Sequence, residues 1–475
     1  MLSIKSREDF TNEKKSIVLL MASLMALSAV GCGANSAKAD ETKEEAVEPV
    51  TELSGTQTAV VMGDDWGPAV TKTILHLDRQ VTADSVSAED FGVSETKEQF
   101  NFAALAEDSN EDPIKHIEVT ADRKVTDAYT CDANGNKSED SDYVAIEMYY
   151  SPNDGSPYCY DIFTSQNTVC DPYKLAVSLN KGQTISTADG SEISKITVDE
   201  KINLSLDSAI YPQLAGADLS GTYTGETGHT LTYGSFKPAE DGKKHPLVIW
   251  LHGAGEGGKL NEIAVLGNEV SALYGDEFQE VMGGAYVLTP QTETFWLQYN
   301  EDGEWGTNPG KDSIYLKDVK GLIDQYIAEN DGIDTNRIYI GGCSNGGFMT
   351  MDMILNYPDF FAAAFPICEA YMDSGITDAQ LKGIKDLPVW FIYAANDDTV
   401  VPDNFEIPTI KRLEAMGANV HKSVFDDVHD NSGRFTGEDG KPYQYMGHWS
   451  WIYFFNNECE EDGVNMWNWL AEQSK

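Results

Sequence analysis

Gly342-Cys343-Ser344-Asn345-Gly346 is the stretch of sequence that decides the fold. It reads G-x-S-x-G, follows an apolar run at residues 337–341 and precedes a helix-like run at residues 348–356. A serine on a tight turn between a strand and a helix presents its hydroxyl above the sheet, and the flanking glycines allow the turn. The pentapeptide alone is a weak signal. Its strand–turn–helix context predicts that Ser344 is a nucleophile and not part of an ordinary glycine-rich turn.

The part of the chain around this turn, residues 221–475, alternates continuous apolar runs with helix-like patterns. Strands that are buried on both faces of a parallel sheet have such runs, and residues 316–327 have helical spacing. The alternation predicts an α/β domain with an open, mostly parallel sheet, right-handed crossovers and helices on both faces. The apolar runs lie at residues 246–251, 285–288, 337–341, 362–366 and 389–394.

The preceding segment, residues 56–220, has a different pattern. Its apolar residues alternate with polar ones, as in Val144, Ile146 and Met148, and turn signals such as Asn134-Gly135 separate the runs. Period-two patterning with frequent turns predicts antiparallel strands, and several such strands in this length predict a β-sandwich. The same alternation occurs at residues 117–119, 175–179 and 202–206.

A nucleophilic serine needs a base, and the base needs an acid that orients it. Where the serine sits on a turn of this kind, the acid and then the histidine follow it along the chain. The acid belongs just past the strand at residues 389–394, where we prefer Asp398 to the neighbouring Asp397. For the base we prefer His448, ahead of the last helix, and keep His429 as the alternative.

A tetrahedral intermediate carries an oxyanion that backbone N–H groups must stabilise. The loop after the first buried strand, residues 251–256, is where one donor is expected. We therefore predict that the N–H groups of Ala254 and Asn345, the residue after the nucleophile, form the oxyanion hole. His252 precedes the serine in the chain, so we interpret it as a brace of this loop and not as the base.

Three further residues are candidates for the substrate side of the site. Trp296 and Trp305 lie in a polar loop after the strand at residues 285–288, where aromatic side chains either form a pocket or pack on the body of the domain. Glu369 follows the strand at residues 362–366 and either points at the site or is surface charge.

The first residues predict export. Residues 16–31 form a short apolar stretch after Lys14 and Lys15, which is typical of a signal peptide. The stretch ends in Ala29-Val30-Gly31-Cys32, which resembles a bacterial lipobox, so residues 1–32 predict a lipoprotein signal with lipidation at Cys32. A lipid anchor holds a protein to a membrane without crossing it. The alternatives are a cell-surface lipoprotein and a plainly secreted protein, with residues 33–55 as an acidic tether.

Composition limits the class of partner and the use of the cysteines. The chain has 78 acidic and 33 basic residues, and a surface this anionic repels phosphate backbones, which argues against nucleic-acid binding. Cys159 and Cys170 are close enough in sequence to bridge a hairpin, although the pairing of cysteines cannot be read from sequence. Cys343 is expected to be a small buried side chain under the serine turn. No metal or organic cofactor is implied.

Residues 246–256, 337–347 and 467–473 resemble the α/β-hydrolase "predicted peptidase" group, which is related to secreted polyhydroxybutyrate-depolymerase-like and feruloyl-type esterases. In that group a Gly-His-x-x-Trp segment precedes the last helix, and Gly447, His448 and Trp451 match it. The residues between Val428 and His448 are longer than the group's pattern.

Residues 63–68, Gly-Asp-Asp-Trp-Gly-Pro, are similar to the immunoglobulin-like N-terminal domain of bacterial extracellular esterases. Together the two resemblances imply a serine carboxylesterase that acts on a small-molecule ester through an acyl-enzyme. Two alternatives stay open: a serine peptidase that uses the same triad, and a cell-surface carbohydrate-binding protein with a degenerate hydrolase domain.

Overall fold

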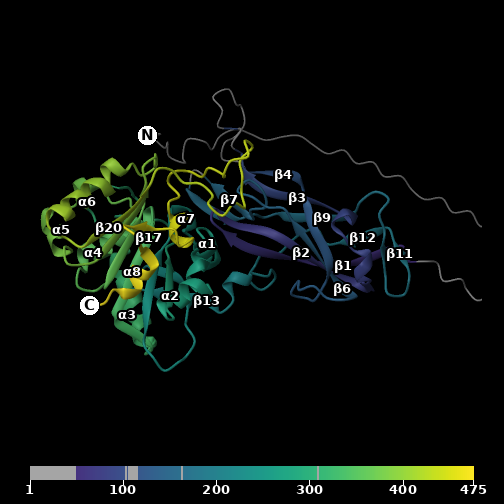
Figure 1. Cartoon of the computed structure of the whole chain (residues 1–475), viewed down its shortest axis with the longest axis horizontal. Helices are drawn as coiled ribbons and strands as arrows, with labels where there is room; N and C mark the ends of the chain where they lie inside the picture. The colour runs from purple at the N-terminus through teal and green to yellow at the C-terminus, as the bar shows by residue number, and fades with distance from the viewer. Residues whose placement is uncertain (1–49, 102–103, 105–115, 162–163, 308–309) are drawn as a thin grey trace, which may run out of the picture. The chain divides into compact units, whose positions relative to one another are not determined.

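The computed structural model describes residues 50–101, 104, 116–161, 164–307 and 310–475 (Figure 1). The predicted signal segment, the lipidation site Cys32 and most of the acidic tether lie outside the described residues. Among the helices that are described, none is both long enough and apolar enough to cross a bilayer.

The N-terminal β-domain is built from two sheets. The larger has the strand order β12-β1-β2-β6-β5, and the smaller has the order β4-β3-β9. A separate hairpin, β7–β8, has Tyr160 paired with Asn167. The strands are β1 (Glu52–Asp64), β2 (Gly67–Val81), β3 (Phe91–Phe100), β4 (His116–Arg123), β5 (Val125–Cys131), β6 (Ser141–Met148), β7 (Tyr158–Asp161), β8 (Gln166–Val169), β9 (Tyr173–Leu179), β10 (Ile185–Ser186), β11 (Glu192–Ile193) and β12 (Lys195–Val198).

The alternating pattern explains why these strands form a sandwich. Successive side chains of a strand point to opposite faces, so residues of one parity enter the same core. Val144, Ile146 and Met148 of β6 share a core with Leu75 of β2 and Leu175 of β9. The two sheets therefore close around one apolar layer, as a β-sandwich requires.

The prediction of a strand at residues 202–206 is wrong. Ile202 and Leu204 are buried in the sandwich core, but Leu206 is 40% exposed and the segment makes only an isolated bridge, at Lys201. The Asn203 side chain accepts a hydrogen bond from the backbone N–H of residue 205. This local turn chemistry replaces the ladder that the alternation predicted.

The C-terminal α/β domain contains one eight-stranded sheet, with the order β13-β14-β16-β15-β17-β18-β19-β20. Strands β15 to β20 pair in parallel with one another, whereas β14 pairs antiparallel with both β13 and β16. The strands are β13 (Ala217–Thr224), β14 (Thr230–Phe236), β15 (His245–Leu251), β16 (Tyr286–Gln291), β17 (Ile333–Cys343), β18 (Ala363–Ile367), β19 (Val389–Ala394) and β20 (Val420–Phe425), with a small hairpin of β21 (Glu460–Glu461) and β22 (Val464–Asn465).

Helices cover this sheet on both faces, because its strands are apolar on both faces. In β15, Leu247 and Ile249 enter one core cluster, while Val248 and Trp250 enter the other. The first cluster takes apolar side chains from α3, α4, α5 and α6, and the second takes them from α1, α2, α7 and α8. The helices are α1 (Asn261–Leu266), α2 (Asp276–Met282), α3 (Leu316–Glu329), α4 (Asn345–Asn356), α5 (Asp378–Gly383), α6 (Glu406–Ala415), α7 (Trp451–Phe455) and α8 (Met466–Glu472) (Figure 1).

The predicted α/β sheet, with mostly parallel strands and helices on both faces, is therefore confirmed. The domain limits differ slightly from the expected ones. Strand β1 already begins at Glu52, inside the expected tether, and β13 begins at Ala217. The boundary expected at Gly221 falls within β13, which pairs with β14 and so belongs to the second domain.

Candidate functional site

Ser344 occupies a sharp turn between β17 and α4. Its backbone has φ 55° and ψ −115°, a positive-φ conformation that residues other than glycine rarely adopt. The turn is fixed on both sides, because the Ser344 N–H donates to the Ile367 carbonyl and the Ser344 carbonyl accepts from the Phe348 N–H, each at 2.9 Å. A residue held in so unfavourable a conformation is a mark of a functional site.

The glycines of the motif allow β15 to approach the turn. A Cβ atom on Gly346 would lie 1.9 Å from the Leu251 carbonyl oxygen, and one on Gly342 would lie 2.4 Å from the same atom. Because both contacts are with backbone, neither position has room for a side chain. The G-x-S-x-G pattern is thus a packing requirement of the elbow as well as a conformational one.

His448 and Asp397 form a buried pair next to the elbow. The His448 Nδ1 lies 2.7 Å from the Asp397 Oδ2, and the side chains are 9% and 0% exposed. The other carboxylate oxygen, Oδ1, accepts the N–H groups of Thr399 and Val400 at 2.8 and 2.9 Å. The carboxylate is therefore fixed by three donors, and it fixes the imidazole ring in turn.

The expected acid Asp398 is wrong as the partner of this histidine. Its side chain is exposed, whereas Asp397 is buried against His448. The turn after β19 directs the first of the two aspartates inward, because that carboxylate caps the two N–H groups that follow it. The alternative base, His429, is 39% exposed and pairs with Asp427 instead.

The loop after β15 carries the other predicted elements. His252 is fully buried, with its Nδ1 2.6 Å from the Gly253 carbonyl oxygen and its Nε2 accepting from the Thr292 N–H. Burial lowers the pKa of His252 to about 4, so the ring is neutral and serves to hold the loop. The Asn345 side chain accepts from the Leu297 N–H at 3.1 Å, which ties a further loop to the elbow.

The backbone N–H groups of Ala254 and Asn345 are the two predicted oxyanion donors, and Ala254 is among the residues around Ser344 that border open space. Within the part of the chain that the structure describes, neither N–H donates a hydrogen bond to another group. Ala254 begins a short 3₁₀ turn, residues 254–256, and Asn345 begins α4. Unpaired N–H groups at such positions are the donors that an oxyanion hole uses.

A cavity of about 700 Å³ opens over Ser344 and His448. This volume suits a small organic ligand. The loop at residues 253–256 and the aromatic residues beside His448 form part of its lining. Further lining residues come from the elbow, from Gly267 and Asn268 after α1, from Thr399 after β19 and from Met446. Unexpectedly, the N-terminal β-domain also lines the cavity, with Asp65, Trp66, Pro152, Tyr160, Ser165 and Asn167.

The contribution of the β-domain was missed by reading the sequence. Asp65 and Trp66 form the tip of the β1–β2 hairpin, between the paired residues Asp64 and Gly67. Both residues belong to the Gly-Asp-Asp-Trp-Gly-Pro stretch, by which this domain resembles the N-terminal domain of bacterial extracellular esterases. The stretch identified the domain, but nothing local in it indicates that the hairpin tip reaches a site in the other domain.

The three candidates for the substrate side do not line this cavity. Trp296 is fully buried and donates its indole N–H to the His252 carbonyl, so it braces the loop from below. Trp305 is 50% exposed and packs on Phe295. Glu369 is fully buried behind the elbow, and burial raises the pKa of its carboxyl well above the usual range, so it is not surface charge.

The long segment before His448, residues 429–447, docks on the β-domain. Arg434 donates to the Asp64 carboxylate at 2.8 Å and to the Tyr150 hydroxyl, and Phe435 packs edge-on against Trp66. This segment is longer than in the α/β-hydrolase group that the sequence resembles, and the added residues have a structural role. They connect the loop that carries His448 with the tip of the β1–β2 hairpin, which lines the cavity.

Two of the residues that line the cavity, Glu256 and Cys343, are themselves buried. Glu256 is 5% exposed, and burial raises its carboxyl pKa from 4.5 to about 7. Cys343 is fully buried beside the elbow, in the place expected for it. All six cysteines among the described residues are free thiols, so Cys159 and Cys170 do not bridge the β7–β8 hairpin.

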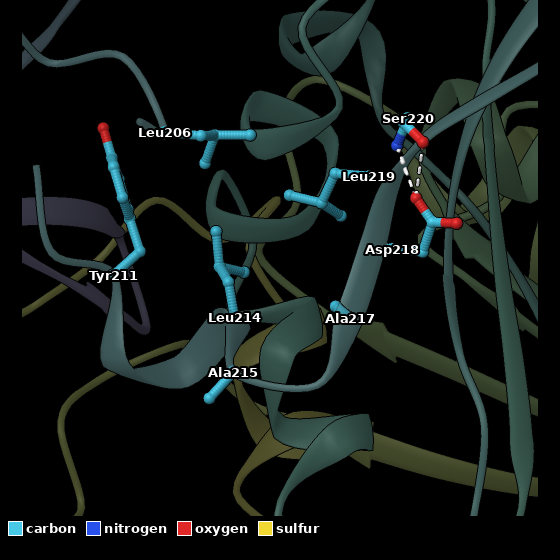
Figure 2. Close-up of a pocket in the computed structure, with 8 residues that line it drawn as sticks. All are labelled: Leu206, Tyr211, Leu214, Ala215, Ala217, Asp218, Leu219 and Ser220. Atoms are coloured by element: carbon cyan, nitrogen blue, oxygen red, sulfur yellow. Dashed lines mark hydrogen bonds between the residues drawn. The ribbon is translucent and has the colours of Figure 1, made fainter. Parts of the chain in front are cut away.

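A second hollow, of about 390 Å³, lies along residues 206–220, between the last strand of the sandwich and β13. Figure 2 shows its apolar lining by Leu206, Leu214 and Leu219, with the Asp218 carboxylate accepting from the N–H and hydroxyl of Ser220. It shares no residue with the cavity over Ser344. Over the described ranges, no group of three or more His, Cys, Asp or Glu residues is arranged to hold a metal ion.

Two family models match the chain. Residues 56–194 match the esterase Ig-like N-terminal domain, and residues 238–437 match the phospholipase/carboxylesterase family. A solved structure of a thermostable esterase superposes with a TM-score of 0.67 at 24% identity, covering 88% of this chain and 100% of that chain. The likeness extends over both domains and shows their fold.

Curated relatives match shorter segments. The chain is 30% identical over 157 residues to poly(3-hydroxyalkanoate) depolymerase C of Paucimonas lemoignei, covering 30% of this chain and 33% of the relative. It is 26% identical over 179 residues to a probable carboxylesterase SOBER1-like of Arabidopsis thaliana, covering 34% of this chain and 63% of the relative. The chain therefore spans one third and just under two thirds of the lengths of these relatives.

Proposed function

We propose that this chain, whose two domains belong to the esterase Ig-like N-terminal and phospholipase/carboxylesterase families, hydrolyses carboxylic esters through an acyl-enzyme on Ser344. The observation that supports this most strongly is the shared cavity of Ser344 and His448, with Asp397 hydrogen-bonded to His448. A serine on a strained elbow beside an oriented imidazole suits acyl transfer.

In the first half of the reaction, the Ser344 hydroxyl attacks the carbonyl carbon of the ester. The Nδ1 of His448 is engaged by Asp397, which leaves Nε2 to take the hydroxyl proton. The tetrahedral intermediate places its negative charge between the N–H groups of Ala254 and Asn345. Nε2–H then protonates the departing alkoxide, and the alcohol leaves behind an acylated Ser344.

In the second half, water replaces the alcohol. His448 Nε2 takes a proton from the water as it attacks the acyl carbon, and the same two N–H groups stabilise the second tetrahedral intermediate. Collapse of that intermediate returns the proton to the Ser344 oxygen and releases the carboxylic acid. No redox step and no second substrate besides water is needed.

The nucleophile is tested by the turnover of p-nitrophenyl acetate. We expect Ser344→Ala to lose at least about 10⁴-fold in kcat, because the remaining groups bind and polarise the ester without attacking it. His429→Ala serves as the matched control, since His429 is partly exposed and pairs outside the cavity. Turnover close to wild type in Ser344→Ala contradicts the proposed function.

Ester hydrolysis is distinguished from the peptidase alternative by matched substrates. An N-acyl amino acid p-nitrophenyl ester and the corresponding p-nitroanilide differ only in the bond that is cleaved. We expect the ester to be cleaved far faster, and a higher kcat/KM for the anilide makes the chain a peptidase with the same site. A fluorophosphonate probe that leaves Ser344 unlabelled supports the degenerate-domain alternative.

We also propose that the chain is exported and lipid-anchored through Cys32. The support is the apolar stretch at residues 16–31 and the lipobox-like residues that end it. Labelling of the chain with radioactive palmitate in a bacterial host, lost in Cys32→Ser, is the expected result. An unlabelled, membrane-free protein in the culture medium supports plain secretion instead.

A further inference from the structure

The β7–β8 hairpin of the N-terminal domain lies against the loop that carries the Ala254 N–H. The Asn167 Nδ2 would be only 2.9 Å from a Cβ atom on Gly255, so the amide packs directly on the backbone of that residue. Gly255 is the middle residue of the short 3₁₀ turn at residues 254–256. The hairpin thus touches the turn whose first N–H is one of the two proposed oxyanion donors.

Two further contacts hold the hairpin in this place. The Gln166 side chain donates to the Glu293 carbonyl at 3.0 Å, and the Tyr158 hydroxyl donates to the Glu262 carbonyl at 3.3 Å. Both acceptors are backbone oxygens of the α/β domain. These contacts anchor the hairpin at several positions along its length, so its place over the loop does not depend on a single side chain.

The hairpin also presents side chains to the cavity over Ser344. Tyr160 and Asn167 are directly opposed in the β7–β8 ladder, so their side chains lie on the same face, and both line the cavity with Ser165. Tyr160 is 42% exposed although its ring is large and mostly apolar. A half-exposed aromatic ring at the wall of a ligand-sized cavity is a contact surface for the ligand.

We propose that the β7–β8 hairpin is a working part of the active site, in which Tyr160 contacts the bulkier part of the ester and Asn167 positions the oxyanion loop. This inference rests on the proposed esterase function and deepens it. Tyr160 is then a specificity-determining residue for esters large enough to reach it. Asn167 is a positioning residue that acts through Gly255 and the Ala254 N–H.

The two roles predict different kinetic effects, which a pair of esters separates. Methyl acetate is the small ester, and 2-naphthyl acetate is the bulky one. We expect Tyr160→Ala to raise KM about tenfold for 2-naphthyl acetate and to leave methyl acetate unchanged, because one ring contact is lost. We expect Asn167→Ala to lower kcat about tenfold for both esters with little change in KM, because a displaced donor weakens only transition-state binding.

Matched variants guard against a general loss of structure. Tyr149→Ala removes a tyrosine that is also 42% exposed but lies outside the cavity, so both kinetic constants should stay at the wild-type level. Asn167→Leu keeps the size of the side chain and should recover most of the kcat that Asn167→Ala loses. Thermal unfolding of each variant is measured alongside, and a kcat effect at unchanged unfolding temperature is the expected result.

The outcomes separate this inference from the function on which it rests. Wild-type constants in both Tyr160→Ala and Asn167→Ala, with turnover still lost in Ser344→Ala, overturn the role of the hairpin and leave the esterase intact. Equal losses in KM and kcat for both esters in Tyr160→Ala overturn its role in specificity. A wild-type protein that hydrolyses neither ester overturns the proposed function and the hairpin's role with it.

Discussion

At the scale of single residues, the site depends on which of two neighbouring aspartates holds His448. Asp397 is buried, accepts two backbone N–H groups and lies 2.7 Å from the imidazole, whereas Asp398 is exposed. In Asp397→Asn the amide replaces the carboxylate that fixes the ring tautomer and stabilises the imidazolium. We expect kcat for p-nitrophenyl acetate to fall about 10³- to 10⁴-fold.

Asp398→Asn is the control for this prediction, because it makes the same chemical change one residue away. We expect its kcat within about twofold of wild type, since an exposed carboxylate outside the cavity stabilises no intermediate. A larger loss in Asp398→Asn than in Asp397→Asn contradicts the assignment of the acid.

The adjacent aspartates also show where sequence reading reached its limit. The strand at residues 389–394 and the position of the acid after it could be predicted, because a buried strand has a continuous apolar run. The choice between two neighbouring carboxylates depends on the turn that follows. That turn directs the Asp397 oxygen to the N–H groups of Thr399 and Val400, and no local pattern reports it.

At the scale of elements, the elbow depends on the close approach of β15 and α4. A Cβ atom on Gly346 would stand 1.9 Å from the Leu251 carbonyl oxygen, so Gly346→Ala must push two backbone segments apart. We expect it to lower the free energy of unfolding by about 2–3 kcal/mol, measured by urea denaturation, and to reduce turnover.

The matched control is Gly383→Ala, at the end of α5. A Cβ atom there meets nothing within 4 Å, so alanine should be neutral or stabilise the helix by up to about 1 kcal/mol. If Gly346→Ala is as stable as Gly383→Ala, the elbow is not as tightly packed as described.

The loop between β20 and α7 is the second element that matters, because it joins the two domains before it delivers His448. Arg434 pairs with Asp64, whose side chain is 4% exposed, while Arg434 itself is 51% exposed. In Arg434→Met the buried carboxylate loses its cation. We expect the free energy of unfolding at pH 8 to fall by about 1 kcal/mol, a value that allows for solvent screening of the exposed partner.

Arg79→Met is the control for the interdomain pair, since Arg79 and Asp189 are 42% and 52% exposed. We expect a change below about 0.5 kcal/mol for such a surface pair. If both substitutions lower the free energy of unfolding by the same amount, the pair of Arg434 and Asp64 is no stronger than an ordinary surface ion pair.

At the scale of the whole molecule, buried acids make stability depend on pH. Burial raises the pKa of Glu256 from 4.5 to about 7 and the pKa of Asp64 from 3.8 to about 6. A carboxyl whose pKa is raised by folding favours the folded state while it is protonated. Its contribution is complete at low pH and is lost as the pH rises through the folded-state pKa.

The free energy of unfolding should therefore fall between about pH 5 and pH 8. The raised pKa of Glu256 alone lowers the free energy of unfolding by roughly 3 kcal/mol over this range. Glu256→Gln removes the titration, so the fall should be smaller by about that amount in urea denaturation at the two pH values. Glu89→Gln is the control at an exposed position and should leave the pH dependence of the free energy of unfolding unchanged. If Glu256→Gln also leaves that dependence unchanged, Glu256 is not a buried carboxyl with a raised pKa.

Also at this scale lies the part of the site that the sequence could not predict. The sandwich and the α/β sheet follow from periods of two residues and from buried runs, which are local patterns. Asp65, Trp66 and Tyr160 line the cavity only because of the way the two domains pack together. Packing between domains produces no periodic pattern in the sequence of either domain. For the same reason, the sequence left open whether Trp296 forms a pocket or packs on the body of the domain, where the structure has it bracing His252 from beneath.

The most direct test of the central claim is the mass of the acylated protein. After rapid acid quenching of a reaction with p-nitrophenyl acetate, we predict a chain that carries one acetyl group, on the peptide that contains Ser344. The adduct should be absent in Ser344→Ala and should accumulate in His448→Ala only at a greatly reduced rate. An acetyl group on another residue, or full turnover with Ser344 never acylated, contradicts the account.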